Sequence, residues 1–284
     1  MKFAIHLSTY QRYYNEDLIP LVEKAAKTGY QAVEIPVLSE LCFNPAELKA
    51  VADFWGMDIL CSTGLSPETD VSSTDAKIRQ QGIDYMKERM DIAYKLNSKQ
   101  FTGVTYSPWG VLQSKGDGKQ NIENSINSIQ IIADYAKSAD VLMGLEILNR
   151  YEGYMINTVA EGLDFIKKVD RDNVKLHFDT FHAHIEENDI YEAIKLGASE
   201  IIHVHFCDNT RGAPLTGQVH WEKVIKGLKE IKYDRYVSIE NFVNTNCEVG
   251  DSAMIWRQVD ESGYKVAERA YENMKKLFGG KYSE

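Results

Sequence analysis

Two patterns of hydrophobic positions alternate along the chain. Short apolar segments rich in β-branched residues are typical of buried strands, and longer segments with apolar residues three to four positions apart are typical of amphipathic helices. The first such pair is FAIHLST from Phe3 and LIPLVEKAAKTG, which ends at Gly29, a residue suited to a helix C-cap. The second pair is AVEIPV from Ala32 and PAELKAVADFW from Pro45, where proline suits a first helical turn.

Six further strand candidates continue this pattern and bring the total to eight. They are DILCSTG from Asp58, QFTGVTY from Gln100, LMGLEIL from Leu142, VKLHFDT from Val174, IIHVHF from Ile201 and YVSIENF from Tyr236. The remaining helices are expected near residues 75–97, 120–139, 158–169, 187–196, 221–231 and 253–277. Eight strand-then-helix units predict an α/β protein with a (β/α)8 TIM barrel fold. Because no linker or composition shift interrupts the chain, residues 1–284 are expected to form a single domain.

Charge and cysteine usage narrow the classes of partner. The formal net charge is -10 and the basic residues are dispersed, so nucleic acid, which requires a basic surface, is not an expected partner. No apolar run is long enough for a membrane span or a signal peptide. The four cysteines lie far apart without a C-x-x-C pair, which indicates free thiols and a cytoplasmic protein.

Four of the later strand candidates carry a side chain that can bind metal near the carboxyl end. These side chains are Glu146 in GLEIL, Asp179 in LHFDT, His205 in HVHF and Glu240 in SIENF. In a closed barrel the carboxyl ends of successive strands are neighbours, so the four are expected to converge. A lone buried carboxylate such as Glu146 is also costly unless it is paired, protonated or bound to metal. Three carboxylates and one imidazole suit one divalent ion, for which we favour Mn²⁺ over Mg²⁺ or Co²⁺.

Three further polar residues lie only a few positions beyond a proposed ligand. By default Glu152, His182 and Arg211 would be solvated loop residues, but their position places them at the rim of the same pocket. Trp109, in the loop after the fourth strand candidate, and His6, inside the first, either contact the substrate or simply pack.

Two histidines precede a proposed ligand by two positions and therefore point to the same side of their strands. His177 precedes Asp179, and His203 precedes His205. For His203 the alternatives are packing deeper in the barrel and serving as an additional metal ligand, and we favour packing. For His177 we likewise favour packing with a satisfied hydrogen bond.

The run EILNRYEGYMINTVAEGLDFIKKVDRDNVKLHFDTFHAHIEE, residues 146–187, resembles the ketose 3-epimerases, the group of D-tagatose and D-psicose (D-allulose) 3-epimerases. The resemblance continues through HFCDNTR, GQVHW, SIENFV and VGDSAMIWR, and more weakly through SPWG in the first half. That family is similar to the xylose-isomerase-like barrels and binds one divalent metal, often Mn²⁺, through Glu, Asp, His and Glu on four strands. The matching positions here are Glu146, Asp179, His205 and Glu240.

The same resemblance implies roles for the residues around the metal ligands. Glu152, His182 and Arg211 correspond to residues that contact the sugar around its C1 to C3 oxygens, and Trp109 to an aromatic residue that helps to enclose it. His6 stands where relatives usually have an aromatic residue, so it belongs to the expected substrate contacts as a departure from the family pattern.

The activity implied by the resemblance is C3 epimerisation of free ketoses of the D-tagatose, D-psicose, D-fructose or L-ribulose type through an enediolate. Glu146 and Glu240 are expected to act as the acid/base pair on opposite faces of C3. Because relatives form dimers or tetramers, a homodimer or homotetramer is expected. Two more departures, Cys207 at a small Gly-like position and Asn241 where the family commonly has proline, bear on the preferred sugar.

Other functions are open at this stage. An aldose-ketose isomerase, which moves hydrogen between C1 and C2, would use similar metal ligands on the same barrel. An apurinic endonuclease would need more histidines than the seven present and a basic DNA-binding face. A non-enzymatic sugar-binding protein would keep its sugar affinity without metal. A phosphorylated substrate would meet Arg211 or Lys115, although no Gly-rich phosphate cradle is present.

Overall fold

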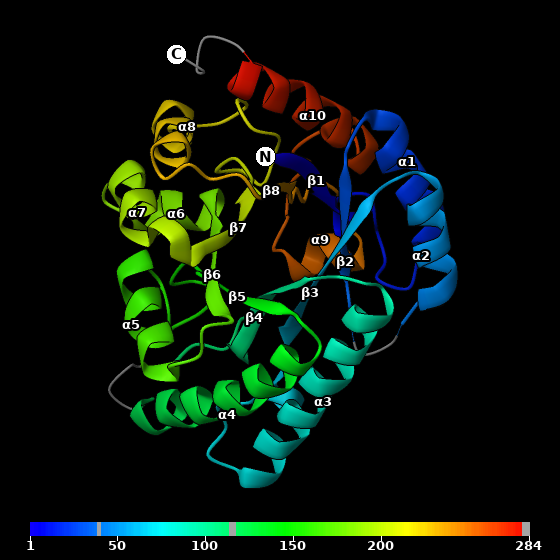
Figure 1. The fold of residues 1–284 in the computed structure, drawn as a ribbon. Coiled ribbons are helices and arrows are strands. Elements are labelled where there is room, and N and C mark those ends of the chain that lie inside the picture. The colour runs from blue at the N-terminus through cyan, green and yellow to red at the C-terminus, as the bar shows by residue number, and fades with distance from the viewer. Residues whose placement is uncertain (39–40, 114–117, 280–284) are drawn as a thin grey trace.

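The computed structural model describes residues 1–38, 41–113 and 118–279, which fold into a closed parallel barrel surrounded by helices (Figure 1). Within these residues eight strands pair in chain order, and β1 pairs with β8 to close the barrel. The strands are β1 (Lys2–His6), β2 (Ala32–Pro36), β3 (Asp58–Leu65), β4 (Gln100–Pro108), β5 (Leu142–Glu146), β6 (Val174–Asp179), β7 (Ile201–Phe206) and β8 (Tyr236–Ile239). The predicted single-domain (β/α)8 TIM barrel is confirmed.

Helices alternate with the strands and cover the outside of the barrel (Figure 1). They are α1 (Ile19–Thr28), α2 (Pro45–Phe54), α3 (Ala76–Lys95), α4 (Lys119–Ser138), α5 (Val159–Val169), α6 (Thr180–Glu186), α7 (Ile190–Gly197), α8 (Trp221–Glu230), α9 (Glu248–Ser252) and α10 (Gly263–Gly279). Short 3₁₀ turns lie at Leu7–Thr9, Pro67–Thr69 and Ala198–Glu200. As predicted, Pro45 begins α2 and Gly29 ends α1 in the left-handed conformation, with φ of +112°.

Two helix predictions were wrong. A single final helix was expected over 253–277, but α10 begins only at Gly263. Met254 has φ of +58°, a left-handed conformation that a continuous right-handed helix excludes. The residues directly after Asp179 were expected in a loop, yet they form α6. The Asp179 carboxylate accepts hydrogen bonds from the first backbone N–H groups of that helix, at 2.5 and 3.3 Å, and so acts as its N-cap.

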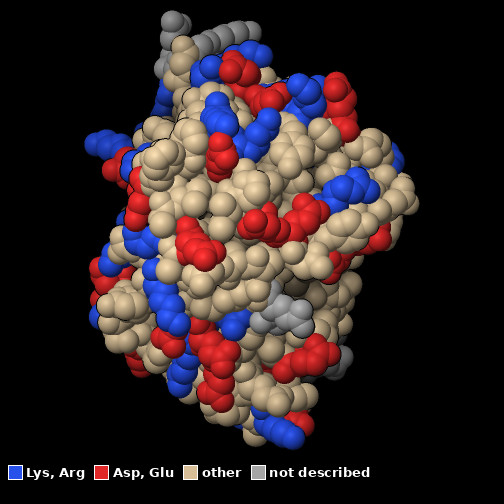
Figure 2. Space-filling view, turned by 90° about the vertical axis from the view of Figure 1, so that its right-hand side faces the viewer, with Lys and Arg blue, Asp and Glu red and all other residues tan. Residues whose placement is uncertain are grey.

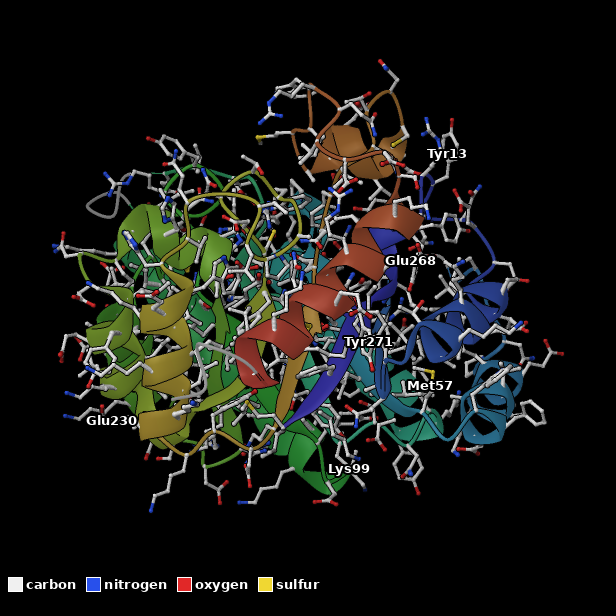
Figure 3. All side chains as sticks on the ribbon, turned by 90° about the horizontal axis from the view of Figure 1, so that it is seen from above. Tyr13, Met57, Lys99, Glu230, Glu268 and Tyr271 are labelled. Atoms are coloured by element: carbon white, nitrogen blue, oxygen red, sulfur yellow. The ribbon has the colours of Figure 1, made fainter. Side chains whose placement is uncertain are left out.

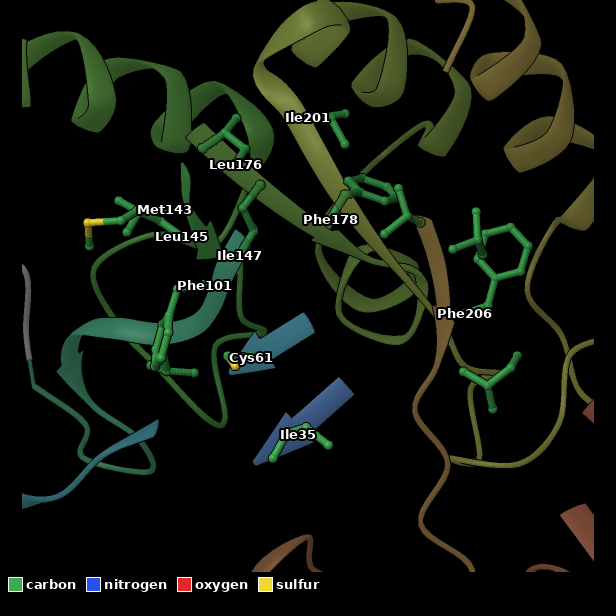
Figure 4. Close-up of a cluster of buried hydrophobic side chains, with 14 of the residues drawn as sticks. Ile35, Cys61, Phe101, Met143, Leu145, Ile147, Leu176, Phe178, Ile201 and Phe206 are labelled. Atoms are coloured by element: carbon green, nitrogen blue, oxygen red, sulfur yellow. The ribbon is translucent and has the colours of Figure 1, made fainter. Parts of the chain in front are cut away.

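The strands divide the interior into an apolar outer layer and a more polar centre. Alternate side chains point outward and pack under the helices, and Figure 4 shows part of this buried layer, including Phe101, Leu145, Phe178 and Phe206. Each such side chain contributes about 1.5–3 kcal/mol when fully buried. The inward positions at the amino end are small or apolar, at Ala4, Ala32 and Leu60. Toward the carboxyl end they become polar and include Glu34, Thr102, Glu146, His177, Asp179, His203 and His205, all buried.

The last helix ties the end of the chain to its beginning. Figure 3 shows α10 alongside β1, with Tyr271 of the helix near the strand. The ring of Tyr271 lies 6.2 Å from that of Phe3 and 5.1 Å from that of Tyr30. The hydroxyl of Tyr30 also donates to the Ala267 carbonyl at 2.8 Å. These contacts hold the first and last units together and so stabilise the closed barrel.

The surface drawn in Figure 2 carries acidic and basic side chains interspersed with neutral ones, without a continuous basic area. Among the described helices, none combines the length and the apolar character needed to cross a membrane.

Candidate active site

The four predicted metal ligands meet at the carboxyl end of the barrel. Glu146 ends β5, Asp179 ends β6, His205 lies near the end of β7, and Glu240 directly follows β8. One ligand atom from each lies within 4.8 Å of those from the others. The Nδ1 atom of His205 lies 3.5 Å from Glu240 Oε2, 3.7 Å from Asp179 Oδ2 and 4.0 Å from Glu146 Oε1. The structure thus gathers these side chains from four strands into one group that could hold a metal ion.

The donor set fits a divalent cation. Asp179 Oδ2 and His205 Nδ1 are buried, and neither has a hydrogen-bond partner among the described residues. Buried polar atoms are rarely left unpaired, so two such unpaired atoms beside two further carboxylates indicate a ligand at their centre. Burial, together with the charges of Glu240 and Asp179, raises the pKa of Glu146 well above its usual range. The ionised carboxylates repel one another because water does not screen their charges in this buried place. A bound cation would relieve that repulsion.

The two glutamates differ in their surroundings. Burial also disfavours the charged form of Glu240, but His205, His6 and Arg211 outweigh it and lower the pKa of Glu240 to about 2. Glu146 is shifted in the opposite direction. Carboxylates whose pKa values are driven apart by their environments are typical of acid/base pairs in enzymes.

His182 presents a hydrogen-bond donor to this group from α6. Its Nδ1 atom accepts hydrogen bonds from the backbone N–H of Asn149 at 3.1 Å and from the Asn149 side-chain amide at 2.8 Å. An atom that accepts from a backbone N–H carries no proton, so in the neutral imidazole the proton is on Nε2. His182 Nε2 lies 3.7 Å from Glu146 Oε1. Asn149, which the sequence analysis did not single out, therefore fixes the orientation of His182.

Arg211 and Glu152 form a buried ion pair on the rim of the site. Arg211 Nη2 lies 3.1 Å from both carboxylate oxygens of Glu152, and Nη1 lies 3.4 Å from Glu240 Oε2. The guanidinium also stacks 3.8 Å from the ring centre of Phe181. The indole N–H of Trp109 donates to Glu152 Oε2 at 3.0 Å. The structure thus connects Trp109, Glu152 and Arg211 to the metal-ligand group.

Arg211 is held in place by a loop with an unusual conformation. Its φ is +62°, and its backbone N–H donates to the Asp208 carbonyl at 2.8 Å. Asn241 donates through its side chain to the Gly212 carbonyl at 2.7 Å. Its backbone N–H donates to Thr9 Oγ1 at 3.1 Å, a contact that proline would not make. Asn241 therefore contributes directly to anchoring this loop.

A cavity of about 370 Å³ opens above the metal-ligand group. All the predicted substrate-contact residues line it, namely His6, Trp109, Glu152, His182 and Arg211. The ring of His6 is fixed from two sides, because Nε2 lies 3.0 Å from Ser62 Oγ and Nδ1 accepts from the backbone N–H of Ser8 at 3.3 Å. The volume of the cavity suits a small, polar molecule such as a monosaccharide. Lys115, the second candidate for a phosphate contact, lies outside the described residues.

The sequence did not lead us to predict one buried carboxylate beside the site, Glu34. Glu34, in β2, is fully buried and lies within 3.0 Å of both His203 Nε2 and His205 Nε2. Burial alone would raise the pKa of Glu34, but these two imidazoles hold it well below its usual range. The sequence does contain a feature that points to Glu34. This carboxylate interrupts the apolar segment AVEIPV in the same way as Glu146 interrupts its own strand.

The two inner histidines behave differently. His203 is buried, as predicted, and is bonded to Glu34. The prediction that His177 makes a hydrogen bond is wrong, because neither of its ring nitrogens has a partner in the described part of the chain. Its Nδ1 atom lies 3.9 Å from Glu146 Oε2. His177, His203 and His205 form a second group with ring nitrogens close enough to hold a metal, but it shares His205 with the first.

Comparisons with known proteins agree with this geometry. The family model described as "Xylose isomerase-like TIM barrel" matches residues 22–259. The chain belongs to this family. It is 35% identical to a D-psicose 3-epimerase of Ruminiclostridium cellulolyticum over 91% of this chain and 90% of the relative. It is 31% identical to an L-ribulose 3-epimerase of a Methylomonas species, covering 89% of both. The predicted resemblance to the ketose 3-epimerases is confirmed.

The fold of a solved relative is also closely similar. The D-psicose 3-epimerase of Clostridium cellulolyticum H10, crystallised with D-tagatose, superimposes with a TM-score of 0.91 at 32% identity. The match covers 98% of this chain and 99% of that one. The similarity thus extends over the whole barrel, including all four strands that supply the metal-ligand group.

Proposed function

We propose that this protein is a ketose 3-epimerase, a metal-dependent isomerase that inverts C3 of free ketoses of the D-tagatose, D-psicose, D-fructose or L-ribulose type. The observation that carries the proposal is the group of Glu146, Asp179, His205 and Glu240 at the base of a sugar-sized cavity. The same chain is 35% identical to a D-psicose 3-epimerase over nearly its whole length.

The proposed cofactor is one divalent cation held by these four residues. When bound, it supplies Lewis-acid stabilisation of the negative charge that develops on the substrate oxygens next to C3. Oxygen-rich donor sets favour Mn²⁺, Mg²⁺ and Co²⁺, and we propose Mn²⁺ as the native ion.

Inversion at C3 requires that a proton leave one face of the carbon and another arrive at the opposite face. We assign these transfers to Glu146, which ends β5, and Glu240, which directly follows β8, because both line the cavity. One carboxylate takes the C3 proton as the enediolate forms, and the other, in its protonated form, returns a proton to the opposite face. The direction of the reaction decides which glutamate acts first.

The remaining residues orient the sugar. The Nε2–H of His182 and the guanidinium of Arg211 are donors that can meet the oxygens of the substrate as charge develops there. Glu152 accepts from Arg211 and Trp109, and it can accept from a sugar hydroxyl as well. Trp109 and His6 line the cavity walls and limit the poses that the sugar adopts.

The test is conversion of free ketoses by metal-stripped protein with Mn²⁺, Mg²⁺, Co²⁺ or no addition. Fructose, psicose, tagatose, sorbose and ribulose would be incubated separately and the products separated by chromatography. C3 epimers formed only with metal support the proposal. Formation of an aldose would instead favour the aldose-ketose isomerase, which uses similar ligands. Sugar binding that persists without metal, with no conversion, would favour a non-enzymatic binding protein.

We also propose a homo-oligomer, either a dimer or a tetramer. Large exposed apolar side chains such as Met254 and Trp256, at 51% and 74% exposure, support this because such side chains are enriched in interfaces. Light scattering during size-exclusion chromatography measures the mass directly, and a monomer would contradict the proposal.

The four cysteines, all free, support a cytoplasmic location.

A further inference from the structure

Glu34 contacts His205 on the side opposite to the metal-ligand group. It lies in β2, is fully buried and does not line the cavity. Its Oε2 atom lies 2.9 Å from His203 Nε2 and 3.0 Å from His205 Nε2, while Oε1 accepts from the Thr102 hydroxyl at 3.2 Å. An ionised carboxylate only accepts hydrogen bonds, so each imidazole presents an Nε2–H to Glu34.

The orientation of His205 follows from this contact. With the Nε2 proton directed at Glu34, the Nδ1 atom faces the opposite way, toward Asp179 Oδ2 at 3.7 Å and Glu240 Oε2 at 3.5 Å. That Nδ1 atom is buried and has no hydrogen-bond partner among the described residues. In the neutral imidazole it carries the lone pair that a cation requires.

We propose that Glu34 is a positioning residue that fixes His205 as the Nε2–H tautomer and aims its Nδ1 lone pair at the metal-ligand group. This inference rests on the proposed function, because it assumes that the group binds a divalent cation. A carboxylate that accepts from the far nitrogen of a ligating histidine also increases the basicity of the near one. Glu34 therefore acts on metal affinity without touching the metal or the sugar.

A purely structural role would have different consequences. Glu34 satisfies two buried imidazoles and one hydroxyl, so its loss would lower stability under either interpretation. Only the positioning role links Glu34 to the protonation pattern of His205 and to metal affinity. The test must therefore measure those two quantities directly.

The first measurement is the affinity of metal-stripped protein for Mn²⁺ by calorimetry, with no sugar present. Glu34→Gln keeps the shape but removes the charge, and we expect its dissociation constant for Mn²⁺ to rise about 10- to 100-fold. Thr102→Val is the matched control, because it removes a hydrogen bond to the other oxygen of the same carboxylate. We expect the control to change the dissociation constant much less than Glu34→Gln does. A folded Glu34→Gln variant with wild-type affinity would overturn the proposal.

The second measurement needs no variant at position 34. Long-range ¹H–¹⁵N correlation spectra of the wild-type protein with a diamagnetic divalent ion, Mg²⁺, report which ring nitrogen of His205 carries the proton. His205→Asn identifies the signals. We expect Nε2 to be protonated, and a proton on Nδ1 would overturn the proposal even if Glu34→Gln fails to fold. Because neither measurement involves a sugar, a protein that binds Mn²⁺ but epimerises nothing would refute the proposed function and leave the role of Glu34 standing.

Discussion

At the scale of single residues, the site brings ionisable groups close together in a buried place. Glu146 and Glu240 share His205 as a neighbour, yet the pKa of the first is raised by burial and by nearby carboxylates, whereas that of the second is lowered to about 2. Such opposed environments allow two chemically identical side chains to perform complementary proton transfers.

Replacement of either glutamate by glutamine should remove a proton carrier with little change of shape. We expect Glu146→Gln and Glu240→Gln each to lower kcat by about 10²- to 10⁴-fold while circular dichroism and chromatographic behaviour stay unchanged. Glu123→Gln, an equal change of charge on an exposed position of α4, is the control. Near wild-type turnover in either active-site variant would exclude that glutamate from the acid/base pair.

Glu152 gives a prediction for the pH dependence of stability. Burial favours its neutral form, but Arg211, His182, Asn149 and Trp109 together lower its pKa from an ordinary 4.5 to about 2. A folded-state pKa below that of the unfolded chain stabilises the protein above about pH 4.5, and this contribution disappears as the pH falls toward 2.

The comparison of wild type with Glu152→Gln isolates this effect. At pH 7 we expect the variant to have a free energy of unfolding lower by about 3 kcal/mol, and the difference should shrink steadily between pH 5 and 3. Urea unfolding across this range measures both values. A difference that is constant with pH would show that the ionised Glu152 contributes no pH-dependent stability.

At the scale of elements, the carboxyl ends of the strands determine which side chains meet. The sequence was sufficient to predict the barrel and the convergence of Glu146, Asp179, His205 and Glu240, because inward positions near strand ends converge whenever the barrel closes. It did not show that Asp179 also caps α6, because one side chain then serves both a helix terminus and the site. The contacts of Arg211 with Glu152 and Glu240 depend on a left-handed backbone conformation that residue type does not predict.

Glu34 and His177 show another limit of sequence reasoning. Hydrophobic periodicity predicts that a residue of a barrel strand faces inward, but it does not say which inward residues across the barrel come into contact. Glu34 on β2 meets His203 and His205 on β7, 169 and 171 positions away. The lack of a hydrogen-bond partner for His177 within residues 1–38, 41–113 and 118–279 likewise depends on how neighbouring strands bring three imidazoles together.

Gly103 provides a test of the strand geometry beside the cavity. It has φ of +106° within β4, and a Cβ there would lie 2.3 Å from the Thr63 carbonyl oxygen, a backbone atom of β3. We expect Gly103→Ala to lower the free energy of unfolding by about 1–3 kcal/mol more than Gly110→Ala does. Gly110 is the matched control because it also has a positive φ, +73°, but open space around it. Equal losses in urea unfolding would contradict the close approach of the two strands.

At the scale of the whole molecule, metal binding should stabilise the fold. The four proposed metal ligands come from β5, β6, β7 and the residue directly after β8, so a cation would link half of the barrel. At a Mn²⁺ concentration of about 100 times the dissociation constant, the added stability is about 2.7 kcal/mol. We expect chelation to lower Tm by about 5 °C or more, and Mn²⁺ to restore it. An unchanged Tm after verified metal removal would argue against a structural link of this kind.

The central claim is that metal-dependent proton exchange occurs at C3 of a free ketose. The most direct test is to incubate the metal-stripped protein with psicose or tagatose in D₂O, with and without Mn²⁺, and to locate deuterium by NMR. We predict deuterium at C3, together with the C3-inverted sugar, only when Mn²⁺ is present. Deuterium at C1 or C2 with formation of an aldose would contradict the claim and identify an aldose-ketose isomerase instead.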